Sequence, residues 1–168
     1  MLVASLCGAA SADEVGDVSR LMKAGQIDAA LASAERHLAQ HPRDAAMRFQ
    51  RAVILADSGR TALAIEAFTA LTQDHPDLPE PYNNLAALHA AQGDYDSARS
   101  ALENALRCQP GYAAAHENLG DVYVALARRA YARTVQLEPA NATVAPKLAL
   151  LRQLAVPVQA APASPASR

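Results

Sequence analysis

The sequence contains no tryptophan, two phenylalanines and five tyrosines among its 168 residues. A β-sandwich or barrel needs β-branched and aromatic residues on its pleated faces, so this scarcity argues against an all-β fold. Hydrophobic residues nevertheless make up 51% of the chain, and alanine accounts for many of them. Small side chains with high helix propensity favour closely packed helices.

Three further deficits exclude classes of function. The formal net charge is -2, without the basic excess that a nucleic-acid-binding face needs. No apolar run approaches the roughly 18 residues that cross a bilayer, so no membrane span is predicted. The only cysteines are Cys7 and Cys108, which are too few for a disulfide framework.

The first dozen residues, MLVASLCGAASA, differ from the rest of the chain. An apolar run closed by an A-x-A motif and followed by Asp13 is typical of a secretory signal peptide. We therefore expect cleavage after Ala12 and a periplasmic protein. The basic segment that usually precedes such a run is missing, which indicates a signal truncated at its start. The alternative is a cytoplasmic protein with a frayed apolar N-terminus.

Three residue types recur along the chain with one period. Positions 34 apart hold the same residue in three sets: Gly25, Gly59 and Gly93; Ala30, Ala64 and Ala98; Pro42, Pro76 and Pro110. A common period in three residue types indicates an internal structural repeat. Each unit predicts a helix, a turn at the glycine, a second helix and a proline that ends it. Alanine at the crossing point lets the two helices approach closely.

The third unit carries the pattern most fully, as Tyr82-x2-Leu85-Ala86-x2-His89, Ala98-x3-Leu102 and Pro110. This resembles the tetratricopeptide repeat family, whose unit is W-x2-L-G-x2-Y, A-x3-F and P. A weaker likeness is to small exported proteobacterial proteins of this kind. The resemblance implies an all-α fold, a right-handed superhelix of stacked helix-turn-helix repeats (an α-solenoid) with about three and a half repeats and a capping helix.

The expected organisation follows from these features. We predict a signal peptide at 1–12, repeats at about 13–44, 45–78, 79–112 and 113–141, a capping helix at 142–155 and a disordered Pro/Ala/Ser-rich tail at 156–168. The first helix is expected to begin near Asp13.

The fourth unit lacks its turn. It opens as His116-x2-Leu119-Gly120-x2-Tyr123, but counted back from Pro139 it is five residues short, and the missing residues are those of the glycine turn. Strong helix formers fill the join, so we predict one helix over 113–138. The expected apolar stripe comprises Leu119, Tyr123, Leu126, Ala130, Thr134 and Leu137. A tight corner near Ala127 is the alternative.

No residue pattern predicts catalysis, a metal site or a cofactor site. His37 and His41 are four residues apart, but no acid or cysteine is in ligand register with them, so both are interpreted as surface histidines. Cys108 has no histidine at a fixed partner spacing and is expected to be a buried, inert thiol. Neither a phosphate-binding glycine loop nor a nucleophile elbow is present. We therefore predict that the protein is not an enzyme.

The resemblance implies a concave groove lined by the first helix of each repeat, which holds a peptide or a partner helix. By register, the groove residues are Phe49, Gln50, Val53, Glu80, Asn83, Asn84, Glu117, Asn118 and Asp121. Asn84 and Asn118 are 34 residues apart, and each amide can donate to and accept from a peptide backbone. The alternative is that these asparagines cap or bridge neighbouring repeats.

The predicted function is a non-catalytic adaptor that binds a segment of a cell-envelope protein. The groove positions hold no cation, which disfavours an acidic C-terminal tail as ligand and favours neutral or basic segments. The alternative is a structural protein that self-assembles through the long helix, so a monomer or a weak homodimer is expected. In that case Arg128, Arg129 and Arg133 would meet Glu80 and Asp121 of a second chain.

Overall fold

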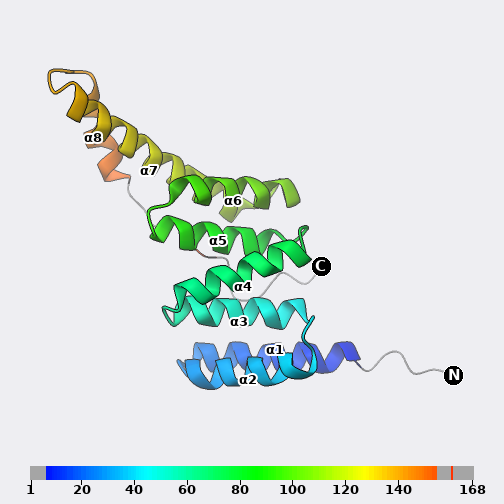
Figure 1. Cartoon of the computed structure of the whole chain (residues 1–168). Helices are drawn as coiled ribbons and strands as arrows, with labels where there is room; N and C mark the ends of the chain where they lie inside the picture. Colours follow the sequence, from blue (N-terminus) through cyan, green and yellow to red (C-terminus); the bar gives the residue numbers. More distant parts are fainter. Residues whose placement is uncertain (1–6, 155–159, 161–168) are drawn as a thin grey trace. The chain divides into compact units, whose positions relative to one another are not determined.

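A computed structural model describes residues 7–154 and residue 160 (Figure 1). Within this part the chain forms helices and no strands, as the predicted all-α class requires. The helices are α1 (Cys7–Lys23), α2 (Ile27–Gln40), α3 (Ala45–Asp57), α4 (Thr61–Asp74), α5 (Pro79–Ala91), α6 (Tyr95–Cys108), α7 (Ala113–Leu137) and α8 (Val144–Gln153). They belong to two compact units, which meet in sequence between Pro76 and Asp77.

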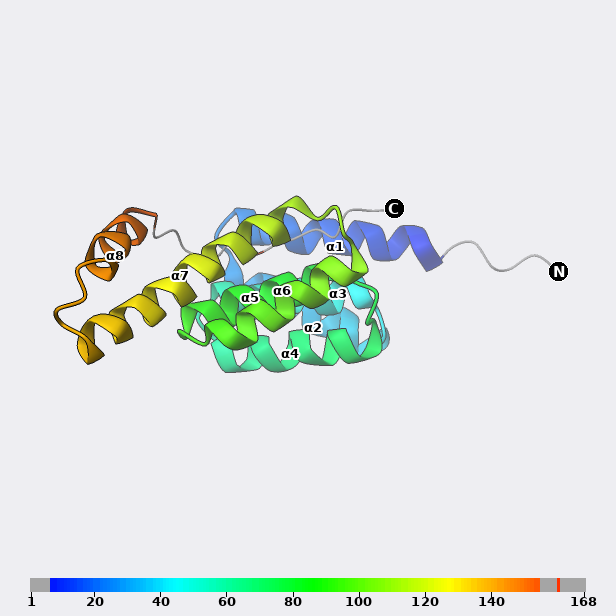
Figure 2. The same ribbon diagram turned by 90° about the horizontal axis from the view of Figure 1, so that it is seen from above.

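Unit 1 consists of two helical hairpins, α1–α2 and α3–α4, with α2 and α1 packed against α3 (Figure 2). Its core is aliphatic and aromatic, and the largest fully buried side chains are Val18, Met47, Ile54, Leu55, Phe68 and Leu71. Each such side chain contributes about 1.5–3 kcal/mol when fully removed from water. Arg51 occupies the position where the repeat motif has leucine, and its Nε lies 3.5 Å from the Glu35 carboxylate of α2.

Glycine makes the turn inside each complete hairpin. Gly25, Gly59 and Gly93 have φ of 72°, 74° and 77°, and among the described residues only these have positive φ. L-residues with a Cβ are disfavoured in this left-handed region. The Arg60 amide then donates to the Leu55 carbonyl at 2.9 Å, the long bond that closes a helix C-terminus in a Schellman motif.

Unit 2 begins with the hairpin α5–α6. Pro79 is the first residue of α5, where its missing N–H costs nothing. Asp94 caps α6 by accepting from the Ser97 amide at 3.1 Å. Ala86 and Ala98 are both fully buried, as the predicted close crossing of α5 and α6 requires.

The fourth unit is one helix, as predicted, because α7 continues without a break through the join where the turn is missing. Its buried residues differ from the predicted stripe: Ala115, Asn118 and Val122 are buried, whereas Tyr123 is 50% exposed. α7 packs on α5 and α6, and the buried Asn118 donates to Asn83 of α5. Within unit 2, α7 extends past the end of α6 (Figure 1).

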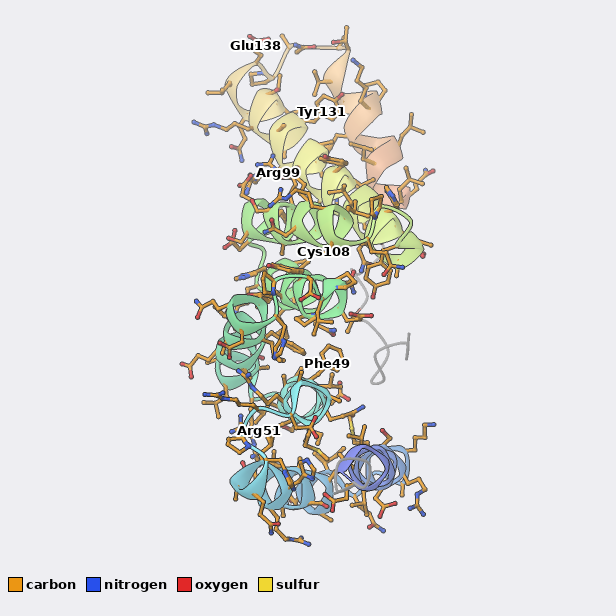
Figure 3. The ribbon with its side chains drawn as sticks, turned by 90° about the vertical axis from the view of Figure 1, so that its right-hand side faces the viewer. Phe49, Arg51, Arg99, Cys108, Tyr131 and Glu138 are labelled. Carbon is orange, nitrogen blue, oxygen red and sulfur yellow. The ribbon has the colours of Figure 1, made fainter. Side chains whose placement is uncertain are left out.

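The helix predicted at 142–155 is present as α8, which packs along the far half of α7. Val144 and Leu148 of α8 are buried. The ammonium of Lys147 lies 5.8 Å from the ring centroid of Tyr131, which is labelled in Figure 3.

The first helix begins at Cys7, six residues before the predicted start near Asp13. Residues 8–12 are rich in alanine, which has the highest helix propensity, so the helix extends into them. The first half of the predicted signal peptide and the predicted tail, apart from residue 160, lie outside the described residues.

Candidate protein-interaction site

The three groove residues predicted in unit 1 are buried side chains of α3. Phe49, Gln50 and Val53 are 3%, 0% and 7% exposed. The Phe49 ring packs edge-on against Phe68 of α4, with centroids 5.6 Å apart (Figure 3). Both polar atoms of the Gln50 amide are buried without a hydrogen-bond partner among the described residues.

The three groove asparagines of unit 2 are also buried, and their hydrogen bonds differ. The Asn118 amide of α7 donates to the Asn83 side-chain oxygen of α5 at 2.8 Å. Asn84 instead donates to the Glu80 carbonyl of its own helix at 3.0 Å. The pair Asn83–Asn118 therefore joins two successive first helices, the bridging role that was the alternative to peptide binding.

The groove acids of unit 2 reach solvent. Glu117 is exposed, and Glu80 and Asp121 are half-buried. Burial raises the pKa of the Asp121 carboxyl, and the negative charge of Glu117 raises it further. The Asn83–Asn118 bond joins the two helices that carry these acids, with Glu80 one helical turn before Asn83 and Glu117 next to Asn118.

Tyr112 lies beside this acidic surface, at the residue that precedes α7. Its hydroxyl is buried and has no hydrogen-bond partner among the described residues. Burial raises the pKa of the phenol, and the Glu80 charge adds to the rise. The hydroxyl is therefore a neutral donor and acceptor close to the Glu80 carboxylate.

The arginines of α7 are not a free cationic cluster. The Arg129 guanidinium donates to the Asp96 carboxylate of α6 at 2.7 Å, and Arg133 donates to Gln136 of its own helix at 3.3 Å. Arg128 is half-buried, whereas Arg129 and Arg133 are exposed. Arg129 and Asp96 are both about half exposed, so their ion pair contributes little to stability.

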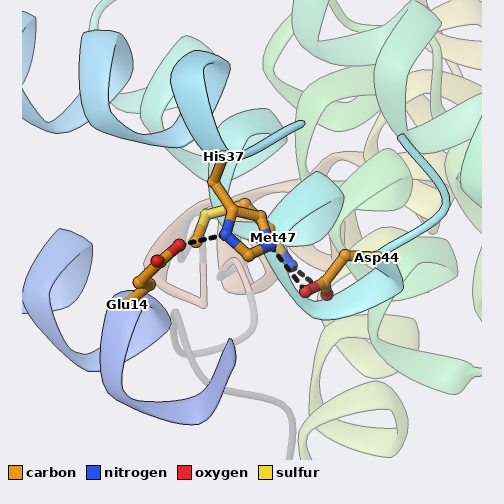
Figure 4. Close-up of polar contacts among 4 residues, drawn as sticks. All are labelled: Glu14, His37, Asp44 and Met47. Atoms are coloured by element: carbon orange, nitrogen blue, oxygen red, sulfur yellow. Dashed lines mark hydrogen bonds and ion pairs between the residues drawn. The ribbon is translucent and has the colours of Figure 1, made fainter. Parts of the chain in front are cut away.

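His37 corrects the interpretation of a surface histidine. Its side chain is 4% exposed and lies between two acids that precede and follow it in the chain (Figure 4). Nδ1 pairs with Glu14 of α1, and Nε2 pairs with Asp44 at 2.9 Å. Asp44 also caps α3 by accepting from the Met47 amide at 3.0 Å. One imidazole thus links α1, α2 and the start of α3.

Burial lowers the pKa of His37, but hydrogen bonds and charges from Glu14 and Asp44 outweigh it, so the pKa is raised from 6.5. His41 packs against the same ring, with centroids 4.8 Å apart.

A family profile described as tetratricopeptide repeat matches residues 12–106, more than half of the chain. The chain belongs to the tetratricopeptide repeat family. A second tetratricopeptide repeat profile matches residues 89–135 and continues through the join in α7. Membership of this family marks the chain as a protein-interaction module.

Solved structures show the same fold. The crystal structure of MamA protein has a TM-score of 0.62 and 20% identity, over 87% of this chain and 82% of that one. A tetratricopeptide repeat protein from Parabacteroides merdae has a TM-score of 0.58 and 17% identity, over 84% and 57%. The structure of Naa15/Naa10 bound to HypK-THB has a TM-score of 0.59 and 21% identity, over 85% and 22%. At these identities the likeness shows the fold alone.

The tetratricopeptide register contains a signal for His37 that the sequence interpretation did not use. In the second and third repeats the equivalent positions, 34 and 68 residues later, hold Leu71 and Ala105, and both are fully buried. The spacing alone therefore predicts an interior side chain at position 37. The two acids that surround His37 come from the preceding helix and the following turn. The spacing between His37 and His41 carries no information about them.

The remaining sequence predictions concern Cys108, metal ligands and membrane spans. Cys108 is half-buried rather than buried, and burial followed by the Asp77 charge raises the pKa of its thiol, which disfavours the nucleophilic thiolate. Across the described side chains, no three His, Cys, Asp or Glu residues are grouped to hold a metal ion. None of the described helices is both long and apolar enough to cross a membrane.

Proposed function

We propose that the protein is a non-catalytic adaptor that binds a basic segment of a partner protein on the acidic surface of α5 and α7. This acidic surface consists of Glu80, Glu117 and Asp121. The family supports protein binding in general, and the acids specify the charge of the ligand. The partner is proposed to be a protein of the cell envelope.

The observation that carries the proposal is the lack of an internal counterion. None of the three carboxylates forms an ion pair with a Lys, Arg or His side chain among the described residues. The raised pKa of Asp121 reflects burial first and then repulsion from Glu117. A lysine or arginine of a partner would relieve that repulsion and replace the lost hydration.

The buried asparagines support this surface from beneath. Because the Asn118 amide donates to the Asn83 oxygen, the two asparagines would hold the acids of α5 and α7 at a fixed spacing rather than bind a peptide backbone. Preordered carboxylates spare a ligand the cost of ordering them. We assign Asn84 to the same supporting role.

We retain Phe49, Gln50 and Val53 as a second proposed contact region, in unit 1. A buried amide without a partner is unfavourable by roughly 1–3 kcal/mol. An extended peptide backbone offers both the donor and the acceptor that the Gln50 amide lacks. Binding there requires the neighbouring side chains to move, because Gln50 is fully buried.

Fluorescence anisotropy with labelled peptides tests the ligand charge. We expect lysine- and arginine-containing peptides to bind more tightly than glutamate-containing peptides of the same length, and the affinity to fall with added salt. The variant Glu117→Gln/Asp121→Asn should weaken binding of the basic peptides about two- to thirtyfold, since partly exposed ion pairs contribute roughly 0.2–1 kcal/mol each.

Glu66→Gln is the matched control, because Glu66 is exposed on α4 in unit 1. It should bind the basic peptides as the unchanged protein does. Equal affinity for acidic and basic peptides, or an equal loss in the control, would contradict the acidic surface as the binding site.

We further propose that the chain is exported and that residues 1–12 are removed. Cleavage after Ala12 would retain Glu14, which binds His37, so the linkage among the first three helices would survive processing. Mass spectrometry of protein expressed with its upstream genomic sequence should give a chain that starts at Asp13. A cytoplasmic product that retains Met1 would refute both the signal peptide and the periplasmic location.

Self-assembly through α7 is the second candidate function. The ion-pair version, in which Arg128, Arg129 and Arg133 bind acids of another chain, is weakened because Arg129 already pairs with Asp96. The observation that favours assembly is instead an uncharged face of α7 that remains exposed.

A further inference from the structure

The first half of α7 lacks the helix that covers its counterpart in the third repeat. In α5, which packs against the returning helix α6, Leu85 and Ala86 are 6% and 0% exposed. The equivalent residues of α7, 34 positions later, are Leu119, which is half-buried, and Gly120, which is exposed. Tyr123, three residues further on, is 50% exposed. A surface built to pack a second helix is therefore open in unit 2.

The second half of α7 carries the sequence of that missing second helix. Ala127, Tyr131 and Thr134 have the same spacing of four and three residues as the second-helix positions Ala98, Leu102 and Ala105. Pro139 follows Ala127 by the same interval that separates Pro110 from Ala98. Because the five-residue turn is absent and α7 is continuous, this second half cannot fold back onto the first half of its own chain.

One stripe of side chains runs along this open face through both halves. The α7 stripe consists of His116, Gly120, Tyr123, Ala127, Ala130 and Thr134, of which Ala127 and Thr134 are half-buried and the others exposed. The successive spacings are four, three, four, three and four residues, the heptad pattern of helices that pack side by side. The pattern is the same when read from either end, and its centre, residue 125, is the midpoint of α7.

The stripe is complementary to itself in size and charge. When two copies run antiparallel about residue 125, Tyr123 lies opposite Ala127 of the second copy, and Gly120 lies opposite Ala130. A large side chain thus meets a small one, and two small residues meet where the helices approach most closely. The stripe contains no Asp, Glu, Lys or Arg, so like charges do not face each other.

We propose that α7 pairs antiparallel with α7 of a second copy of this chain through the α7 stripe. Each copy supplies the second helix that the other lacks, in a two-fold symmetric exchange. Loss of the turn then converts a contact within one repeat into a contact between chains. The arginine–acid contacts predicted from the sequence are not needed for this pairing.

Light scattering coupled to size-exclusion chromatography of the full chain tests the proposal. We expect a mass of twice 17.6 kDa for the unchanged protein, and a monomer for Tyr123→Glu. The matched control is Leu63→Glu, because Leu63 is 48% exposed on α4, outside the stripe. It should remain a dimer. A monomeric unchanged protein, or a dimeric Tyr123→Glu variant that elutes as the control does, would overturn the proposal.

Restoring the turn gives a second test that does not depend on a disruptive charge. Inserting the five residues of the third turn, Ala-Gln-Gly-Asp-Tyr (residues 91–95), between Val124 and Ala125 recreates the 34-residue period. The inserted chain should close its own hairpin and become monomeric, with unchanged helical circular dichroism. Persistence of the dimer with that helical signal would show that the missing turn does not cause the pairing.

Discussion

The third and fourth repeats show that the five residues of the glycine turn decide between a helical hairpin and one continuous helix. Both begin with a first helix of the same pattern, and both contain a second-helix pattern that ends in proline. Gly93, with φ of 77°, turns the third repeat into the pair α5–α6. Without an equivalent residue, the same pattern in the fourth repeat continues as the 25-residue helix α7. Turn residues, rather than the helical patterns on either side, set the topology here.

Proline at the join in α7 should give the largest loss of stability, because it interrupts the continuous helix that distinguishes the fourth repeat from the third. Ala127→Pro removes an intrahelical hydrogen bond and clashes with the preceding turn, so it should destabilise α7 by about 3 kcal/mol or more. Ala113→Pro is the control, because Ala113 is the first residue of α7, where proline is tolerated. Urea unfolding monitored by circular dichroism should separate the two variants clearly. Equal midpoints would indicate a corner at Ala127 rather than a continuous helix.

The second-largest effect should be a difference in stability between alanine variants of Asn84 and Asn118, which occupy equivalent positions in two repeats. Asn118→Ala removes the donor to the buried Asn83 oxygen and should cost about 1–3 kcal/mol in unfolding free energy. Asn84→Ala should cost less, because the Glu80 carbonyl is also positioned to accept from the backbone of α5. Replacing both Asn83 and Asn118 by leucine should recover part of the loss, since neither partner is then left unpaired. Equal losses in the two alanine variants would refute the bridge between α5 and α7.

The two repeats require opposite residues at this point, so exchanging glycine for alanine in the third repeat and alanine for glycine in the fourth should destabilise both. Gly93→Ala forces a Cβ into the left-handed region and should destabilise by roughly 1–2 kcal/mol, although the space around the glycine is open. Ala127→Gly weakens a helix interior and should destabilise by about 1 kcal/mol. Thermal melts of both variants check the pair. A stabilising Ala127→Gly would contradict the helical join.

The smallest expected effect concerns the first repeat, where His37 replaces the apolar residue of the other repeats. Its pKa is raised from 6.5 in the folded protein, so its stabilising contribution is fully present below pH 6.5 and is lost as the pH rises through the raised value. The melting temperature should therefore fall from pH 6 to pH 8 in the unchanged protein, but less so in His37→Leu.

His41→Leu is the control for this titration, because His41 is exposed beside the same ring. It should keep the pH dependence that His37→Leu loses. If both variants titrate alike, the Glu14–His37–Asp44 linkage does not account for the pH dependence.

The sequence predicted the helices well because glycine, proline and alanine each fix a local feature. Three glycines 34 residues apart identified the turns, and the absence of a fourth identified the continuous α7. Contacts between side chains of different helices were harder to predict from the sequence. His37 has the spacing of a buried residue, but its acids are 23 residues before it and seven after it. The apolar stripe predicted along α7 indicated one continuous helix, but it did not identify the buried residues, which include the polar Asn118.

Binding surfaces were harder to predict because repeat register gives the helix face on which a residue lies but not how far its side chain is buried. Register placed Phe49, Asn83 and Glu117 on one kind of face. Burial separates them: the first two are 3% and 0% exposed, whereas the third reaches solvent. Whether any of them contacts a partner remains a prediction.

The packing pattern also has a consequence for how the chain acquires its structure. Every closely packed helix pair in the described part of the chain joins neighbours in sequence or helices separated by one other. Low contact order of this kind favours rapid folding, because short loops close before long-range contacts are needed. Each hairpin can therefore pack as it leaves the ribosome, before the helices that follow it have been synthesised. The C-terminal end of α7, past the contact of Arg129 with Asp96 of α6, packs against α8. It should exchange its amide hydrogens sooner than α5 and α6 do.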